Sequence, residues 1–103
     1  MEGIKSYQKP KGYVLDTIYD IIELQNGRLI LSDAKLGRVQ YRVAMYGYFW
    51  ELLYTVAETG RNRCDVTLRI IGDRHDKARE IRREFALLES MLGEGVKVKI
   101  SDN

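Results

Sequence analysis

Apolar and polar residues alternate through the middle of the chain, beginning at residues 38–46. Val39, Tyr41, Val43 and Met45 occupy one parity, and mostly polar residues lie between them. Successive side chains of a β-strand point to opposite faces of the sheet. This period of two therefore predicts a half-buried strand.

Two further runs alternate in the same way. Their apolar positions are Trp50, Leu52, Tyr54 and Val56 within residues 48–58, and Cys64, Val66, Leu68 and Ile70 within residues 63–71. Gly47 and residues 59–62 supply turn chemistry between consecutive runs, so short hairpin links are the simplest connections. The three strands are predicted to pair antiparallel as a meander.

A helical period follows over residues 74–92. Its apolar stripe recurs at spacings of three and four and consists of Ala78, Ile81, Phe85, Leu88 and Leu92. Asp73 is expected to cap the first turn, Asp76 adds negative charge near it, and Gly93 and Gly95 end the helix. Burial of each large residue of the stripe is worth about 1.5–3 kcal/mol before ordering entropy is subtracted. We therefore expect this helix to dock on the apolar face of the sheet.

Residues 13–25 fit two patterns. As a helix they gather Val14, Ile18 and Ile22 on one face, and Asn26 with Gly27 gives a good stop. As a strand they would enter a type I′ turn at the same Asn-Gly pair and form a hairpin with the residues that follow. The alternation before residue 24 is poor, which favours the helix, with residues 28–32 as the first strand of the sheet.

The two ends of the chain add short segments. Residues 1–11 form a polar lead-in, although Ile4 and Tyr7 could hold it as an edge strand. Residues 96–100 alternate Val or Ile with Lys, which predicts a short strand whose lysines face water and protect a sheet edge. The expected fold is α+β, a four- to five-stranded antiparallel meander with helices near residues 13–25 and 74–92, in the order α-β-β-β-β-α-β.

Composition limits the class of protein. With 103 residues, 45% of them hydrophobic, the chain is long enough for one core, so a single domain over residues 1–103 is expected. The sequence has 17 basic and 15 acidic residues, which gives no net-charge argument for nucleic acid or an anionic membrane. A lone cysteine, Cys64, is expected to be an inert core thiol. Without a signal-peptide or membrane-span pattern, we expect a cytoplasmic protein.

Candidate catalytic or metal-binding groups are sparse. Asp16, Asp20 and Glu23 share one helical face, but no His or Cys lies at a spacing that would complete a metal shell, so a solvated face is expected. His75 is the only histidine, and no Ser or Cys nucleophile is near it in sequence, so an exposed side chain is expected. The sequence thus favours a non-enzymatic protein without a metal or cofactor.

Basic residues are numerous near the final helix, but acidic residues interleave with them. Pairs such as Lys77 with Glu80, or Glu80 with Arg83, predict a salt-bridged solvent face that also includes Glu84. No run of aromatics and glycines typical of an RNA-binding sheet is present. The pattern disfavours nucleic acid as a partner.

Residues 45–50 hold four aromatics and a methionine around Gly47 at a hairpin tip. Because side chains alternate, Tyr46, Tyr48 and Phe49 cannot all point into one core. The tip could be a corner of the core, the mouth of a pocket or a protein contact surface, since clustered exposed aromatics often mark such surfaces. Tyr46, Tyr48 and Phe49 are the candidate interface residues.

The run "WELLYTVAETGRNRCDVTLRIIG", followed by "DKAREIRREFALLESML" as a closing helix, resembles the carboxy-terminal half of helix-grip domains of the START and polyketide-cyclase-like superfamily. The resemblance covers residues 49–92 and implies a sheet around a terminal helix with an apolar ligand between them. This chain is shorter and adds residues 96–100, which argues against a large cavity.

Two functions follow from these features. The leading one is a non-enzymatic module that contacts a protein partner, including a second copy of itself, through the aromatic tip and any uncapped strand edge. The alternative is a binder of small apolar, lipid-like molecules. Its candidate pocket is lined by Tyr41, Trp50, Tyr54, Leu68, Ile81 and Phe85.

Overall fold

The computed structural model describes residues 2–45, 47–72 and 75–93. Its elements, in chain order, are β1 (Glu2–Tyr7), α1 (Lys11–Leu24), β2 (Arg28–Asp33), β3 (Arg38–Met45), β4 (Tyr48–Gly60), β5 (Arg63–Ile71) and α2 (Lys77–Leu92). The predicted α+β class is confirmed, with an antiparallel sheet and one helix before and one after the four-strand meander. The fifth strand is β1, and the predicted strand at residues 96–100 lies outside the described residues.

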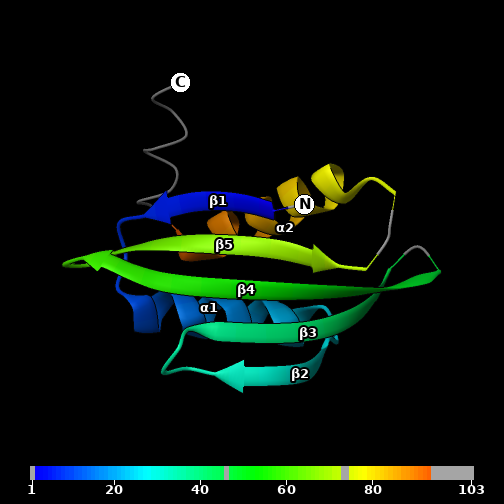
Figure 1. Cartoon of the computed structure of the whole chain (residues 1–103), viewed down its shortest axis with the longest axis horizontal. Helices are drawn as coiled ribbons and strands as arrows, with labels where there is room; N and C mark the ends of the chain where they lie inside the picture. Colours follow the sequence, from blue (N-terminus) through cyan, green and yellow to red (C-terminus); the bar gives the residue numbers. More distant parts are fainter. Residues whose placement is uncertain (1, 46, 73–74, 94–103) are drawn as a thin grey trace.

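The sheet has the order β1-β5-β4-β3-β2, and every neighbouring pair is antiparallel. After β1 the chain crosses through α1 to the far edge, and the meander β2 to β5 then returns until β5 lies beside β1 (Figure 1). Two segments distant in sequence, Glu2–Tyr7 and Arg63–Ile71, are thereby joined. Among the strands that the structure describes, β1 and β2 are the outermost.

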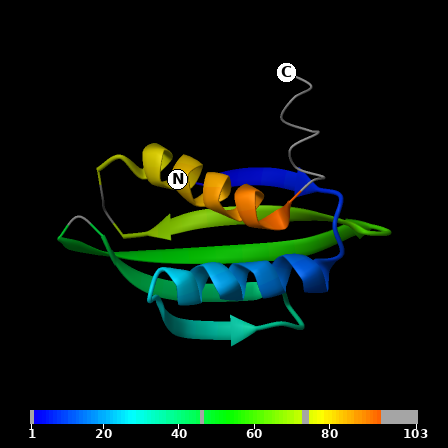
Figure 2. The same cartoon turned by 180° about the vertical axis from the view of Figure 1, so that it is seen from behind.

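Both helices cover the same face of the sheet, behind it in Figure 1 and in front of it in Figure 2. The predicted alternation determines which side chains meet them. Val39, Tyr41 and Val43 of β3 are buried, whereas Arg38 and Arg42 on the opposite face are exposed. The molecule thus has two layers, with one core between helices and sheet and one sheet face open.

Residues 11–24 form a helix, as the sequence favoured. The chain enters from Pro10, whose fixed φ of −66° suits a helix start, and Pro10 C=O accepts a hydrogen bond from Val14 N–H at 3.1 Å. The stripe Val14, Ile18 and Ile22 is buried against the sheet. Burial of one complete helical face decides between the two patterns that the sequence allowed.

The second helix begins at Lys77, three residues later than predicted. Asp76 has a φ of 58° and lies at the N-cap without capping through its side chain. A left-handed residue cannot continue a helix toward the N-terminus, so His75 lies in the preceding turn and is exposed. Asp73, the predicted cap, lies outside the described residues, and the predicted end at Gly93 is confirmed, where φ is 90°.

Candidate functional site

The aromatic hairpin tip places two of its side chains in solvent. Tyr48 and Phe49 are 60% and 63% exposed, and the Arg42 guanidinium lies 6.0 Å from the centre of the Phe49 ring. Trp50 is buried on the helix side of the sheet, and Tyr46 lies outside the described residues. The expectation that one or two of these aromatics are exposed is met.

The six residues of the predicted apolar pocket are all buried and belong to one hydrophobic cluster. They are Tyr41, Trp50, Tyr54, Leu68, Ile81 and Phe85. The rings of Tyr41 and Tyr54 stack with 6.3 Å between their centroids and 6° between their planes. Their hydroxyls are directed to a carboxylate on α2, so this part of the interior is polar as well as apolar.

A pocket of about 300 Å³ lies where β1 meets α2. Its lining residues are Gly3, Ile4, Lys5, Ile81, Arg82, Phe85, Ala86 and Glu89. Ile81 and Phe85 are shared with the predicted set, and the other four predicted residues do not line it. The sequence did not indicate the contribution of β1, because residues 1–11 looked like a polar lead-in.

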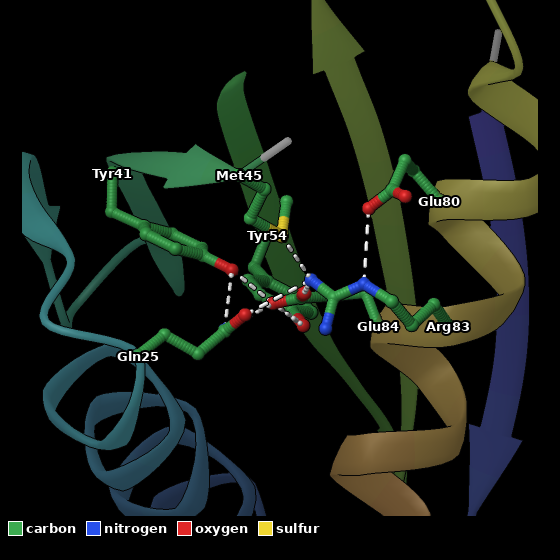
Figure 3. Close-up of polar contacts among 7 residues, drawn as sticks. All are labelled: Gln25, Tyr41, Met45, Tyr54, Glu80, Arg83 and Glu84. Atoms are coloured by element: carbon green, nitrogen blue, oxygen red, sulfur yellow. Dashed lines mark hydrogen bonds and ion pairs between the residues drawn. The ribbon is translucent and has the colours of Figure 1, made fainter. Parts of the chain in front are cut away.

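The carboxylate that accepts hydrogen bonds from both tyrosine hydroxyls belongs to Glu84, whose side chain has no exposed surface. Tyr54 Oη donates a hydrogen bond to Glu84 Oε1 at 2.9 Å, and Tyr41 Oη donates a shorter one to the same oxygen. Gln25, at the end of α1, donates to both Tyr41 Oη and Glu84 Oε1. One buried side chain of α2 thus joins β3, β4 and the end of α1 (Figure 3).

Arg83 provides the positive charge of this polar cluster. Its Nη2 lies 3.3 Å from Glu84 Oε2 and 2.9 Å from Gln25 Oε1, and its Nε donates to Glu80 Oε2 at 3.0 Å. The same Nη2 is 2.7 Å from the Met45 sulfur (Figure 3). The guanidinium therefore ties the first half of α2 to α1 and to the end of β3.

This cluster corrects the prediction of a salt-bridged solvent face. The Glu80–Arg83 pair exists, but Glu80 and Glu84 are buried. Both lie on the helix face that carries Ile81 and Leu88, where the sheet offers two phenol donors to Glu84. A buried carboxylate is tolerated when its lone pairs are satisfied by donors of this kind.

Burial changes the proton affinity of the cluster. It raises the pKa of Glu84 above its ordinary value, and the hydrogen bonds from Tyr41 and Tyr54 and the charge of Arg83 act in the opposite direction. Burial and the adjacent Glu84 raise the pKa of both tyrosines. Both phenols accordingly remain protonated donors at neutral pH.

A second buried carboxylate, Glu89, lies further along α2. Tyr7 Oη donates to Glu89 Oε2 at 2.8 Å, and Lys5 Nζ lies 2.8 Å from the same oxygen. Burial raises the pKa of Tyr7, and the hydrogen bond to Glu89 adds to this effect. The pair fastens β1, which is paired with β5, to α2.

Among the residues that the structure describes, β2 carries three consecutive exposed aliphatic side chains. Leu29, Ile30 and Leu31 are 46%, 46% and 45% exposed. In the part of the chain that the structure describes, β2 has a strand partner on one side only, β3. Figure 2 shows α1 beside β2, and Tyr19 Oη of α1 lies 2.5 Å from Ser32 Oγ of β2, while Leu29, Ile30 and Leu31 remain about half exposed.

A bulge in β2 alters which residues share a face. Leu29 lies opposite Tyr41 and Leu31 lies opposite Gln40, so Ile30 is the extra residue. As a result Arg28, opposite Arg42, and Asp33, opposite Arg38, lie on the same open face. The sequence predicted a strand over residues 28–32, but its pattern indicated neither the exposed aliphatic edge nor the bulge.

The α1 carboxylates and Cys64, which the sequence also offered as candidate chemical groups, lie in separate places. Asp16, Asp20 and Glu23 lie on α1 away from its buried stripe, and Cys64 is buried, with burial raising the pKa of its thiol. Within residues 2–45, 47–72 and 75–93, no group of three His, Cys, Asp or Glu side chains could hold a metal ion. Nor does this part of the chain contain a helix long and apolar enough to cross a membrane.

No protein-family model and no curated protein matches this chain. Among solved structures it is similar to the one titled "Crystal structure of Ara h 8.0201". The two share 10% identity over 90% of this chain and 94% of that chain, with a TM-score of 0.40.

Proposed function

We propose that this protein is a non-enzymatic module that acts by protein contact and that its partner is a second copy of itself. The observation that supports this most strongly is the exposed aliphatic edge of β2, where Leu29, Ile30 and Leu31 follow one another. An edge strand of this kind offers backbone hydrogen-bonding groups to another chain. Large apolar side chains beside that edge gain further free energy when they are covered.

The interior supports the same proposal. Tyr41 and Tyr54 stack and direct their hydroxyls to Glu84, which fills part of the space between sheet and helices with a structural polar cluster. The apolar side chains that could contact a partner therefore include those exposed at the surface of the protein. The exposed rings of Tyr48 and Phe49 add a second apolar area at the hairpin tip.

Sedimentation velocity of the full chain over a wide concentration range tests the proposal. We expect the sedimentation coefficient to rise with concentration from that of a monomer to that of a dimer. A sedimentation coefficient that stays at the monomer value up to the highest attainable concentration would refute self-association.

The pocket between β1 and α2 supports a second candidate, the binding of a small apolar molecule. Its volume, about 300 Å³, is at the lower end of the range of small-molecule sites. Ile81 and Phe85 give it an apolar wall, and Lys5 and Arg82 add positive charge. An apolar molecule with an acidic group would fit this combination, in agreement with the ligand type that the helix-grip resemblance implies.

Native mass spectrometry and titration with a fluorescent fatty acid test this candidate. Ala86 is exposed and lines the pocket, so Ala86→Phe should narrow it and weaken binding of the probe about tenfold or more, as a steric block of this size typically costs over ~1 kcal/mol. Ala57→Phe, on the open face of β4, is the matched control and should leave binding unchanged. Equal affinities of the two variants would exclude this pocket.

A further inference from the structure

We infer that two copies pair along their β2 strands, antiparallel and in one register, with Arg28 of each copy opposite Asp33 of the other. This inference rests on the proposed self-association and specifies its surface. The two-fold axis would stand perpendicular to the sheet beside Leu31, so that the two five-stranded sheets continue into one another. Each copy would use the same patch, as an isologous dimer requires.

The composition of β2 permits such pairing. Natural sheets often protect an exposed edge with a lysine or proline in the middle of the strand. In β2 the charged residues Arg28 and Asp33 lie only at the two ends, and the interior consists of three aliphatics and Ser32. The bulge at Ile30 interrupts this edge, but no lysine or proline does, and pairing with a second β2 strand would also shield Leu29, Ile30 and Leu31.

The register follows from the positions of β2 residues against β3. Because Ile30 is the extra residue of the bulge, β2 occupies five positions, which face Arg42, Tyr41, Gln40, Val39 and Arg38 in turn. A two-fold axis at the central position places the first position of one strand opposite the fifth of the other. Arg28 then faces Asp33 twice, and Leu31 faces its own copy across the axis.

Side-chain orientation agrees with this register. Arg28, Leu31 and Asp33 lie on the open face, since their partners on β3 are Arg42, Gln40 and Arg38. Directly opposed residues of antiparallel strands lie on the same face, so the two ion pairs and the Leu31 pair can all form there.

Charge also selects against a parallel arrangement in register. Parallel pairing in register would place Arg28 beside Arg28 and Asp33 beside Asp33, and like charges across strands are unfavourable. Within one copy, Arg28 already lies opposite Arg42, whose guanidinium is 3.1 Å from Glu51. In a single copy this row of charges ends at the sheet edge with the positive Arg28. The Asp33 carboxylate of a second copy would therefore place a negative charge beside it.

Charge reversal tests the register. Arg28→Asp and Asp33→Arg should each replace two attractive pairs by two repulsive ones and raise the dimer dissociation constant roughly tenfold or more. An equimolar mixture of the two variants should recover wild-type affinity. In the mixed dimer the introduced aspartate faces the introduced arginine, and the native Arg28 of one variant faces the native Asp33 of the other. Arg61→Asp, in the exposed turn between β4 and β5, is the control and should associate like the wild type.

The outcomes separate the two proposals. If the wild type is monomeric at every concentration, the proposed function fails. If it dimerises but both reversals associate like the wild type, or if the mixture is as weak as its components, the register fails while self-association stands. Because Asp33 also accepts a hydrogen bond from Leu36 N–H at 3.0 Å, each variant is first checked for native circular dichroism and cooperative unfolding.

Cysteine cross-linking gives a second readout that does not depend on charge. Leu31→Cys lies next to the axis, so mild oxidation of the dimer should yield a covalent dimer, since opposed residues of antiparallel strands lie within disulfide reach. Tyr48→Cys, at the hairpin tip, should remain monomeric on a denaturing gel. Cross-linking of Tyr48→Cys without cross-linking of Leu31→Cys would move the contact to the tip and overturn the inference.

Discussion

Glu84 has an environment that is unusual for a glutamate. Its carboxylate has no exposed surface. It accepts hydrogen bonds from Tyr41, Tyr54, Gln25 and Arg83. These partners come from β3, β4, the end of α1 and α2 itself, so loss of the carboxylate would affect the packing of both helices on the sheet. Two predictions concern this cluster.

The first prediction is a pH dependence of stability. The pKa of Glu84 is raised above the ordinary glutamate value of 4.5, so above that pH the folded state holds more protons than the unfolded state. Its contribution to stability is complete below pH 4.5 and is lost as pH rises through the folded-state pKa. Each tenfold difference in proton affinity between the two states corresponds to about 1.4 kcal/mol.

Glu84→Gln removes this titration. We expect the unfolding free energy of this variant, minus that of the wild type, to increase from pH 4.5 toward neutral pH in urea titrations. Glu58→Gln, which removes an exposed carboxylate, controls for the change in net charge. A difference that is constant or falls over this range would show that the folded state does not raise the pKa of Glu84.

The second prediction concerns the phenol donors. Tyr54→Phe keeps the stacked ring but leaves Glu84 with one donor fewer, and we expect a loss of about 1–3 kcal/mol in unfolding free energy. Tyr13→Phe, at a half-exposed position of α1, should change it by less than about 0.5 kcal/mol. If Tyr54→Phe is as mild as the control, the hydrogen bond contributes nothing.

The position of Glu84 could have been inferred from spacing. It lies three residues after Ile81 and four before Leu88, and both belong to the stripe from which the helix was predicted. Charge and the neighbouring Arg83 instead suggested a solvent face. The phenol donors come from strands thirty and forty-three residues away in sequence, and no local pattern indicates that they meet Glu84.

At the scale of elements, the turn between β2 and β3 is the most constrained. Gly37 has a φ of 71°, its C=O accepts Val56 N–H at 2.7 Å, and an added Cβ would lie 2.1 Å from Val56 O. The turn is thus held against β4 at a distance that only glycine permits.

The third prediction compares two glycines of similar backbone conformation. Gly47→Ala, where φ is 79° and a Cβ would meet open space, should cost about 1–2 kcal/mol from conformation alone. Gly37→Ala adds a clash with backbone and should cost at least about 3 kcal/mol. Equal losses in thermal or urea unfolding would mean that the turn can move away from Val56 at little cost.

The sequence predicted most elements because each has a buried face with a clear period. β3, β4 and β5 follow their alternation, and α1 and α2 follow their stripes. β1 was left open because its apolar residues are few, and its partners, β5 and Glu89, lie far along the chain. Such distant partners are not visible in local periodicity.

At the scale of the whole molecule, the two sheet edges differ in kind. β1 is held to α2 through Glu89, whereas β2 contacts the helical layer through Ser32 and Tyr19 and leaves its aliphatic residues half exposed. Aggregation in an open series is avoided if β2 pairs with its own copy, because a two-fold contact closes on itself. The molecule would thus associate to a dimer and no further through this edge.

The fourth prediction concerns salt. The Arg28–Asp33 pairs would lie on the open face, where ions screen charges, whereas covering the aliphatic residues does not depend on screening. We therefore expect higher sodium chloride concentrations to weaken the wild-type dimer modestly and to strengthen association of Arg28→Asp, as followed by sedimentation equilibrium. If salt changes association of both proteins in the same way, the Arg28–Asp33 ion pairs do not form part of the dimer contact.

The most direct measurement is amide hydrogen exchange of β2 at low and high protein concentration, followed residue by residue by NMR. If β2 pairs with its own copy, amides of residues 29–32 that face away from β3 should exchange more slowly at high concentration, while those of the β4–β5 turn stay unchanged. Exchange of residues 29–32 that does not depend on concentration, in a sample that sedimentation shows to be dimeric, would contradict pairing through β2.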